Sequence, residues 1–181
     1  MKLAVVGIWF SLLLCTAHFY GQKNENFVVQ SGHSSEVTHL EFSNQGNIFA
    51  SAGKDHNIIL WELESGKQLR TLSGHRSDIN AIVFMPGDSI LGSCSNDSTV
   101  RFWNTFTGEE VCSAKTTFLP TGLTYNKTND NWYIAAKILY EYNLNTKKLI
   151  TFKSPKRRSF DFVYATNSGR LPVSYTHLRA H

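Results

Sequence analysis

The chain has 181 residues, of which 41% are hydrophobic, 18% are charged and 13% are aromatic. This composition excludes an intrinsically disordered chain, and 3 cysteines are too few for a disulfide-rich secreted scaffold. The formal net charge of +4 is a mild excess that does not by itself indicate a nucleic-acid partner.

Residues 1–21 have the features of a signal peptide. Lys2 is followed by an apolar stretch of 13 residues, which is short for a membrane span. Small side chains place a cleavage site after Ala17, and cleavage after Gly21 is a second option. We expect an exported protein, either secreted or periplasmic. An uncleaved membrane anchor is the alternative.

Four short strands are predicted in the next part of the chain. Apolar and β-branched residues occur in runs, and each run ends at turn residues such as Gly53-Lys54-Asp55. Short strands joined by short turns at regular spacing are typical of an antiparallel meander. The expected strands are residues 37–42, 48–52, 57–63 and 68–72.

The same pattern recurs 42 residues later along the chain. Gly32-His33 returns as Gly74-His75, and the apolar positions of the strands keep the same spacing. So many coincidences at a single spacing identify a true internal repeat. The other repeated pairs are Ser51 and Ser93, Asp55 and Asp97, and Trp61 and Trp103.

The repeated unit resembles a WD repeat, with Gly-His at its start, a Ser-x-x-x-Asp turn and a Trp in the third strand. The resemblance implies an all-β fold, namely a β-propeller of four-stranded antiparallel blades around a central channel. It also implies that one His, Ser, Asp and Trp in each blade form a structural, hydrogen-bonded tetrad. The implied tetrads are His33, Ser51, Asp55 and Trp61 in the first repeat, and His75, Ser93, Asp97 and Trp103 in the second.

Serine, histidine and aspartate together could also suggest a hydrolytic triad. A catalytic serine needs exposure, an open site and oxyanion donors. Here the same set occurs twice at blade positions, together with a tryptophan. We therefore interpret both sets as structural, and we predict no catalytic, cofactor-binding or metal-binding residues and no enzyme activity.

A third unit follows the pattern less closely. Tyr142 stands where the other units have Trp, and Ala135 stands about where they have Ser. Neither the His nor the Asp has a counterpart, so a tetrad is not expected in this unit. The expected strands are 121–125, 132–136, 138–143 and 149–152, with the first strand of a fourth unit at 160–164.

The predicted blades occupy residues 27–172 and amount to about three and a half blades. Each blade needs neighbours to bury its faces, so this number cannot close a ring. We expect a longer natural chain to supply further blades, with residues 27–30 as the outer strand of the last one. We expect the 181-residue chain alone to be poorly behaved.

Residues 173–181 carry no strand or helix signal. The codons GTC TCT TAT ACA CAT CTC CGA GCC CAC translate to this segment, and that DNA matches a transposase adapter used to build sequencing libraries. We interpret the segment as an artefact that follows natural sequence ending near Pro172. A genuine basic tail is the alternative.

Other chemically distinctive residues give weaker signals. Cys94 and Cys112 are expected on the second and fourth strands of one blade, about 9–10 Å apart and beyond disulfide reach, as buried free thiols. His39 and His56 lack the spacing of metal ligands. The basic run 153–158 is interpreted as a solvated loop and not as a nucleic-acid or lipid contact.

Two functions are compatible with this sequence. In the first, the blades form a non-catalytic scaffold that binds partner proteins, with no cofactor, no nucleic acid and no membrane contact beyond the signal segment. In the second, they are an accessory module of a larger enzyme, for example a peptidase, whose catalytic domain is missing here. We favour the scaffold because this is what the WD-repeat resemblance most often implies.

Overall fold

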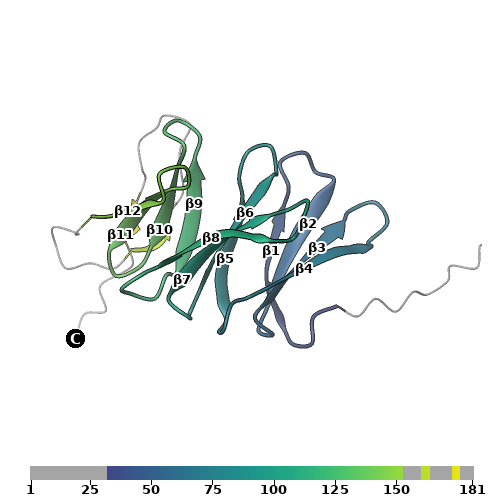
Figure 1. The fold of residues 1–181 in the computed structure, drawn as a ribbon. Coiled ribbons are helices and arrows are strands. Elements are labelled where there is room, and N and C mark those ends of the chain that lie inside the picture. The colour runs from purple at the N-terminus through teal and green to yellow at the C-terminus, as the bar shows by residue number, and fades with distance from the viewer. Residues whose placement is uncertain (1–31, 153–159, 164–172, 176–181) are drawn as a thin grey trace, which may run out of the picture.

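Short runs of β-branched and aromatic residues, each ended by polar or glycine-containing turns, produce an all-β chain. The computed structural model describes residues 32–152, 160–163 and 173–175 (Figure 1). In these ranges twelve strands form three four-stranded antiparallel sheets. The same ranges contain no helix long and apolar enough to cross a membrane. The three sheets confirm the predicted four-stranded blades.

Each blade consists of four strands that are hydrogen-bonded in chain order. Blade 1 contains β1 (Val37–Phe42), β2 (Ile48–Gly53), β3 (Asn57–Glu62) and β4 (Gln68–Ser73). Blade 2 contains β5 (Ile79–Phe84), β6 (Ile90–Ser95), β7 (Thr99–Asn104) and β8 (Glu110–Lys115). Blade 3 contains β9 (Gly122–Asn126), β10 (Asn131–Ala135), β11 (Leu139–Asn143) and β12 (Lys148–Phe152). The predicted strand positions agree with these bounds to within one or two residues.

Successive blades lie side by side in chain order (Figure 1). The first strand of each later blade contacts the first two strands of the blade before it: β5 contacts β1 and β2, and β9 contacts β5 and β6. Strand β13 (Phe160–Val163) contacts β9 and β10 in the same way. It therefore occupies the place expected for the first strand of a fourth blade.

The C-terminal part departs from the sequence prediction at one point. Strand β14 (Val173–Tyr175) pairs antiparallel with β13, although no strand was expected in residues 173–181. Three residues suffice here because β13 offers an edge to which a short segment can hydrogen-bond. The predicted signal peptide, the predicted strand 27–30 and the basic run 153–158 lie outside the described residues.

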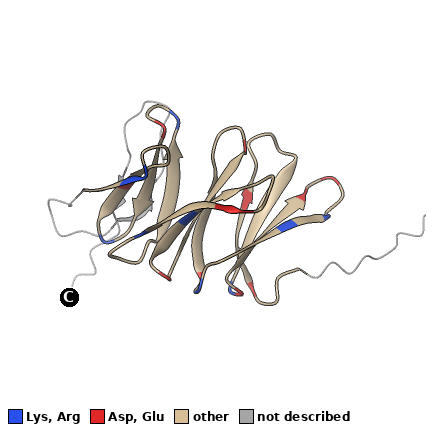
Figure 2. Ribbon diagram, viewed as in Figure 1, with Lys and Arg blue, Asp and Glu red and all other residues tan. Residues whose placement is uncertain are grey.

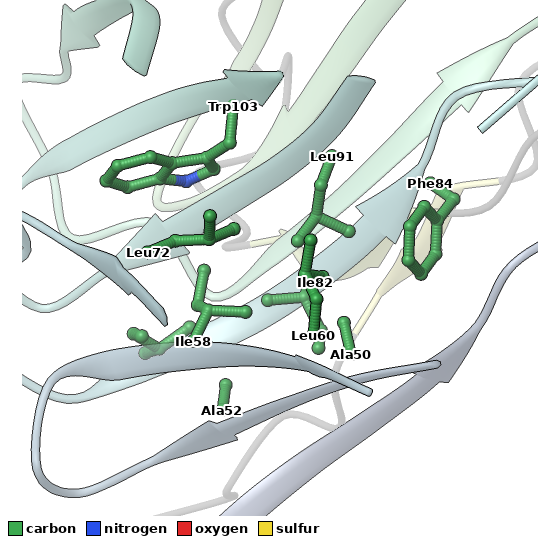
Figure 3. Close-up of a cluster of buried hydrophobic side chains, with 10 residues drawn as sticks. Ala50, Ala52, Ile58, Leu60, Leu72, Ile82, Phe84, Leu91 and Trp103 are labelled. Atoms are coloured by element: carbon green, nitrogen blue, oxygen red, sulfur yellow. The ribbon is translucent and has the colours of Figure 1, made fainter. Parts of the chain in front are cut away.

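The space between blades 1 and 2 is filled by a hydrophobic cluster to which both blades contribute (Figure 3). Ile82 and Phe84 of β5 lie over Ala50 and Leu60 of blade 1. The small alanine side chains on β2 leave room for these larger residues, so the two sheets pack closely at this cluster.

The corresponding face of β1 has no such cover among the described residues. Leu40 is 61% exposed and Phe42 is 59% exposed, whereas Ile82 and Phe84, their counterparts 42 residues later, are each 5% exposed. Full burial of such a side chain contributes about 1.5–3 kcal/mol. Blade 1 thus carries an apolar face built for a neighbouring blade.

Candidate functional site

In blade 1 the predicted tetrad residues form one hydrogen-bonded chain. The indole Nε1 of Trp61 donates to the Oγ of Ser51 at 2.8 Å, and that Oγ lies 2.8 Å from His33 Nε2. His33 Nδ1 is 2.9 Å from Oδ1 of Asp55. The local fold explains this meeting, because β2 and β3 pair next to each other, and hydrogen bonds from Ser34 N to Asp55 and from Lys54 N to the backbone oxygen of Glu36 hold the segment before β1 against the β2–β3 turn.

Blade 2 repeats this geometry. Trp103 Nε1 donates to the Oγ of Ser93 at 2.8 Å, and Ser93 Oγ is 2.8 Å from His75 Nε2. His75 Nδ1 is 2.9 Å from Oδ2 of Asp97. Thr99 adds a bond that blade 1 lacks, since its hydroxyl donates to Oδ1 of Asp97 at 2.6 Å.

The chemistry of the partners fixes the direction of donation at both ends of each chain, and a neutral imidazole then sets the direction between them. An indole nitrogen can only donate and an ionised carboxylate can only accept. His75 must therefore carry its proton on Nδ1 to donate to Asp97, which leaves Nε2 of the neutral ring to accept from the Ser93 hydroxyl. Every donor and acceptor in the chain is then satisfied with a neutral imidazole.

Both carboxylates are held ionised. Burial alone would raise the pKa of Asp97, but donation from the Thr99 hydroxyl, the Arg76 backbone amide and His75 outweighs burial and lowers it to about 2. Burial also opposes ionisation of Asp55, yet donors including His33 and the Ser34 amide lower its pKa below the usual value. Each aspartate thus anchors the loop that precedes its blade.

Burial lowers the pKa of the histidine of blade 2, whereas it acts to raise the pKa of the aspartates. The His75 side chain is 1% exposed, and burial lowers its pKa despite the opposing influence of Asp97. The imidazole is therefore neutral at physiological pH, which agrees with a Ser93 hydroxyl that donates to Nε2.

These sets are poorly arranged for hydrolysis. Ser51 is 3% exposed and Ser93 is fully buried, so a substrate carbonyl has no approach to either hydroxyl. Each Oγ also accepts an indole hydrogen bond, which takes up one of its two lone pairs and lowers its nucleophilicity. The arrangement suits blade geometry better than covalent chemistry.

Comparison with known proteins agrees with this geometry. A family model described as "WD domain, G-beta repeat" matches residues 25–62 and 66–104. These two segments are WD40 repeats. The result confirms the resemblance drawn from the sequence, and the matched residues include all eight tetrad positions.

A short similarity to a human protein was also found. Echinoderm microtubule-associated protein-like 3 is 41% identical over 51 residues, which is 28% of this chain and 6% of that protein. The chain therefore spans only a small part of the length of this relative.

Blade 3 places different residues at the tetrad positions. Tyr142 pairs with Trp132 as Trp103 pairs with Leu91, so the prediction that Tyr142 replaces the Trp is confirmed. The prediction for the Ser position is wrong, because Ile134, and not Ala135, lies opposite Leu123 in the place of Ser93. Strands β1 and β5 each contain a bulge that β9 lacks, and the missing residue shifts the alignment by one.

One functional equivalent in blade 3 was missed by sequence reasoning. The hydroxyl of Tyr140 accepts the backbone amides of Thr117 and Phe118 at 3.0 and 3.3 Å. In blades 1 and 2 the backbone amides of Ser34 and Arg76 donate to the tetrad aspartates. Ser34, Arg76 and Phe118 follow one another at intervals of 42 residues. Tyr140 thus replaces an aspartate as the acceptor for this loop.

A second contact that the sequence did not reveal joins blades 1 and 2. Asp88, in the β5–β6 turn, accepts the backbone amides of Asn44 and Gln45 at 2.7 and 2.9 Å, and the Asn44 side-chain amide at 2.6 Å. We call this contact the Asp88 clamp. The residue 42 positions after Asn44 is Pro86, which has no amide hydrogen, so blade 2 cannot offer the same donor to blade 3.

A groove of 280 Å³ lies beside the Asp88 clamp. It is lined by turn residues of blades 1 and 2, including Phe106, by Ile48 at the start of β2, and by Leu69 and Arg70 of the outer strand β4. We call it the inter-blade groove.

The remaining candidate residues form no metal site within the described ranges. No group of three or more His, Cys, Asp or Glu side chains there could hold a metal ion. His39 Nδ1 bonds the hydroxyl of neighbouring Thr38 at 3.0 Å, and His56 faces Asp78 across 3.6 Å. Cys94 and Cys112 are free thiols; Cys94 is fully buried, which raises its pKa to about 12, whereas Cys112 is only half-buried.

Proposed function

We propose that this chain is part of a non-catalytic scaffold that binds partner proteins, and that it is exported. The observation that supports this most directly is the repetition of the Trp–Ser–His–Asp chain in two successive blades. A catalytic site would be needed once, whereas a device that fixes blade geometry is needed in each blade. WD40 repeats are also generally found in protein-interaction modules.

The distribution of charge favours a protein partner over a nucleic acid. Figure 2 shows basic and acidic segments interspersed along the ribbon of the three blades, with no long stretch of one sign. Nucleic-acid binding depends on a clustered basic surface that neutralises phosphates.

Selection of binding peptides on the folded chain would test the scaffold role. We expect a displayed random-peptide library to yield peptides that bind the folded chain saturably. A variant with both His75→Ala and Ser93→Ala serves as the comparison, because it should lose the structure of blade 2. Enrichment that is equal on both proteins would contradict the proposal.

The exported location rests on residues 1–21 and has its own test. Expression in a secreting host, followed by N-terminal sequencing of the released protein, should give a chain that begins at His18 if cleavage follows Ala17. Retention of Met1 on a cell-associated protein would contradict export. An accessory role in a larger enzyme would instead require a catalytic domain in the same polypeptide, which sequencing of the complete coding region would reveal.

A further inference from the structure

We propose that the inter-blade groove binds a short peptide segment in which an apolar side chain is followed by an acidic one. This inference rests on the proposed scaffold function and names a site for it. The groove has the concave shape that binding requires, and its volume of 280 Å³ lies just below the range of about 300–1,000 Å³ usual for ligand pockets. It therefore suits one large side chain and a neighbouring carboxylate.

The apolar part of the site is formed by side chains from both blades. Ile48 and Leu69 of blade 1 are only partly buried by the core against which they pack. Phe106, in the β7–β8 turn, is 69% exposed and lines the same groove. An apolar side chain placed among these three would remove their remaining surface from water.

The charged part of the site is Arg70. Its Nε and Nη2 donate to the backbone oxygen of Phe106 at 3.3 and 3.0 Å, and its Nη1 donates to the backbone oxygen of Leu69 at 3.0 Å. Its side chain lies over Gly108, where an added Cβ would come within 3.1 Å of Arg70 Cδ. The guanidinium is thus held in place before any ligand arrives, which lowers the entropic cost of binding.

No acidic side chain pairs with Arg70 in the part of the chain that the structure describes. Its three hydrogen bonds go to two neutral carbonyl oxygens, those of Phe106 and Leu69, so two of its five N–H groups and its full positive charge stay available. The other charged group in the groove, Asp88, keeps its negative charge, but it is only 5% exposed and both of its carboxylate oxygens accept hydrogen bonds from Asn44 and Gln45, so Arg70 is the charge that a ligand meets. The charge that complements this site is therefore a carboxylate.

The next blade boundary lacks these features. The counterpart of Arg70, 42 residues later, is Cys112, whose Sγ lies 3.5 Å from the hydroxyl of Tyr142. The place of Phe106 in the turn is taken by Asn145, which donates to Asp130 at 3.2 Å. Arg70 and the exposed ring of Phe106 therefore occur together at only one of the two described blade boundaries. A residue pair that the fold itself needed would be expected at both, so this pair is more typical of a specific binding site.

The test uses two capped peptides, acetyl-Ser-Leu-Phe-Asp-Ser-amide and the same peptide with Asn in place of Asp, titrated into the full chain and followed by NMR. We expect shifts at Ile48, Leu69 and the Arg70 side chain, and about threefold to fivefold weaker binding of the Asn peptide, as for a partly exposed ion pair. Arg70→Gln should remove the difference between the peptides. Arg76→Gln, an exposed arginine outside the groove, should preserve it.

The indole N–H signals of Trp61 and Trp103 show whether each variant keeps its tetrads. If Arg70→Gln has lost these signals, Arg70→Lys takes its place, and it should retain the preference for the Asp peptide because it keeps the positive charge. Absence of shifts in a protein with both indole signals would overturn the groove, and so would equal binding of the two peptides. Saturable peptide binding at another face would overturn the groove while leaving the scaffold function in place.

Discussion

Blades 2 and 3 lie next to each other in the same fold, yet their interiors are organised by different chemistry. In blade 2 a buried chain of four polar side chains links the third strand to the loop before the blade. In blade 3 the ring of Tyr142 stacks on Phe102 of blade 2 with centroids 5.1 Å apart, and the Tyr140 hydroxyl accepts the loop amides. The requirement common to both is an acceptor for the loop backbone, and either aspartate or tyrosine can supply it.

The largest expected effect comes from breaking the chain in blade 2. Ser93→Ala leaves both the Trp103 indole N–H and His75 Nε2 buried without their partner, so we expect a loss of about 2–3 kcal/mol in the free energy of unfolding. Denaturant unfolding measures it. Ser113→Ala, on the exposed outer strand β8, is the matched control and should change stability by less than about 0.5 kcal/mol. Equal effects of the two substitutions would contradict the structural role of Ser93.

Acid should destabilise blade 2 in two steps. The pKa of His75 is lowered in the folded chain, so the unfolded chain takes up a proton first, and stability begins to fall as the pH drops below about 6.5. For Asp97, with a pKa of about 2 against 3.8, roughly 2 kcal/mol is lost as the pH falls through that interval.

Unfolding free energies measured from pH 8 to pH 2 would reveal both steps. His75→Gln should weaken the upper step, to which His39 also contributes because burial lowers its pKa, and should leave the lower step in place. A pH profile for this variant that matches the unsubstituted chain above pH 4 would show that His75 is not the group responsible.

The acceptor role of Tyr140 predicts a smaller effect. Tyr140→Phe keeps the ring but leaves the amides of Thr117 and Phe118 without their acceptor, so we expect a loss of about 1–2 kcal/mol. Hydrogen exchange of these two amides should accelerate. Tyr125→Phe, which removes a hydroxyl from a surface pair with Asp130, is the control and should leave that exchange unchanged.

The Asp88 clamp should contribute least. Asp88 has a left-handed backbone with φ of 59°, which glycine adopts without strain, so Asp88→Gly removes the side-chain bonds to blade 1 and little else. We expect a loss of about 1 kcal/mol. Asp130→Gly is the control, because Asp130 also has positive φ, at 57°, but bonds within its own blade. If Asp130→Gly costs as much as Asp88→Gly, the inter-blade contact has no special role.

The sequence predicted those parts of the molecule in which the same residue types recur at the same positions of successive blades. His33 and His75, with their serines, aspartates and tryptophans, stand at one constant spacing, so a single offset located both hydrogen-bonded sets. The same offset placed Ala135 where the structure has Ile134, because a missing bulge in β9 cannot be recognised from residue types. The Asp88 clamp and the Arg70 site each combine segments of two blades. Only the stacking of the blades brings these segments together, so the spacing of residues along the chain does not reveal them.

The most direct test of the structural assignment of Ser51 and Ser93 is their reaction with a fluorophosphonate probe, which labels activated serines. The folded chain should show no modification of either serine by mass spectrometry, since both are buried and bonded to an indole. Labelling of Ser93 that is lost in His75→Gln would contradict this assignment and would indicate a hydrolytic site.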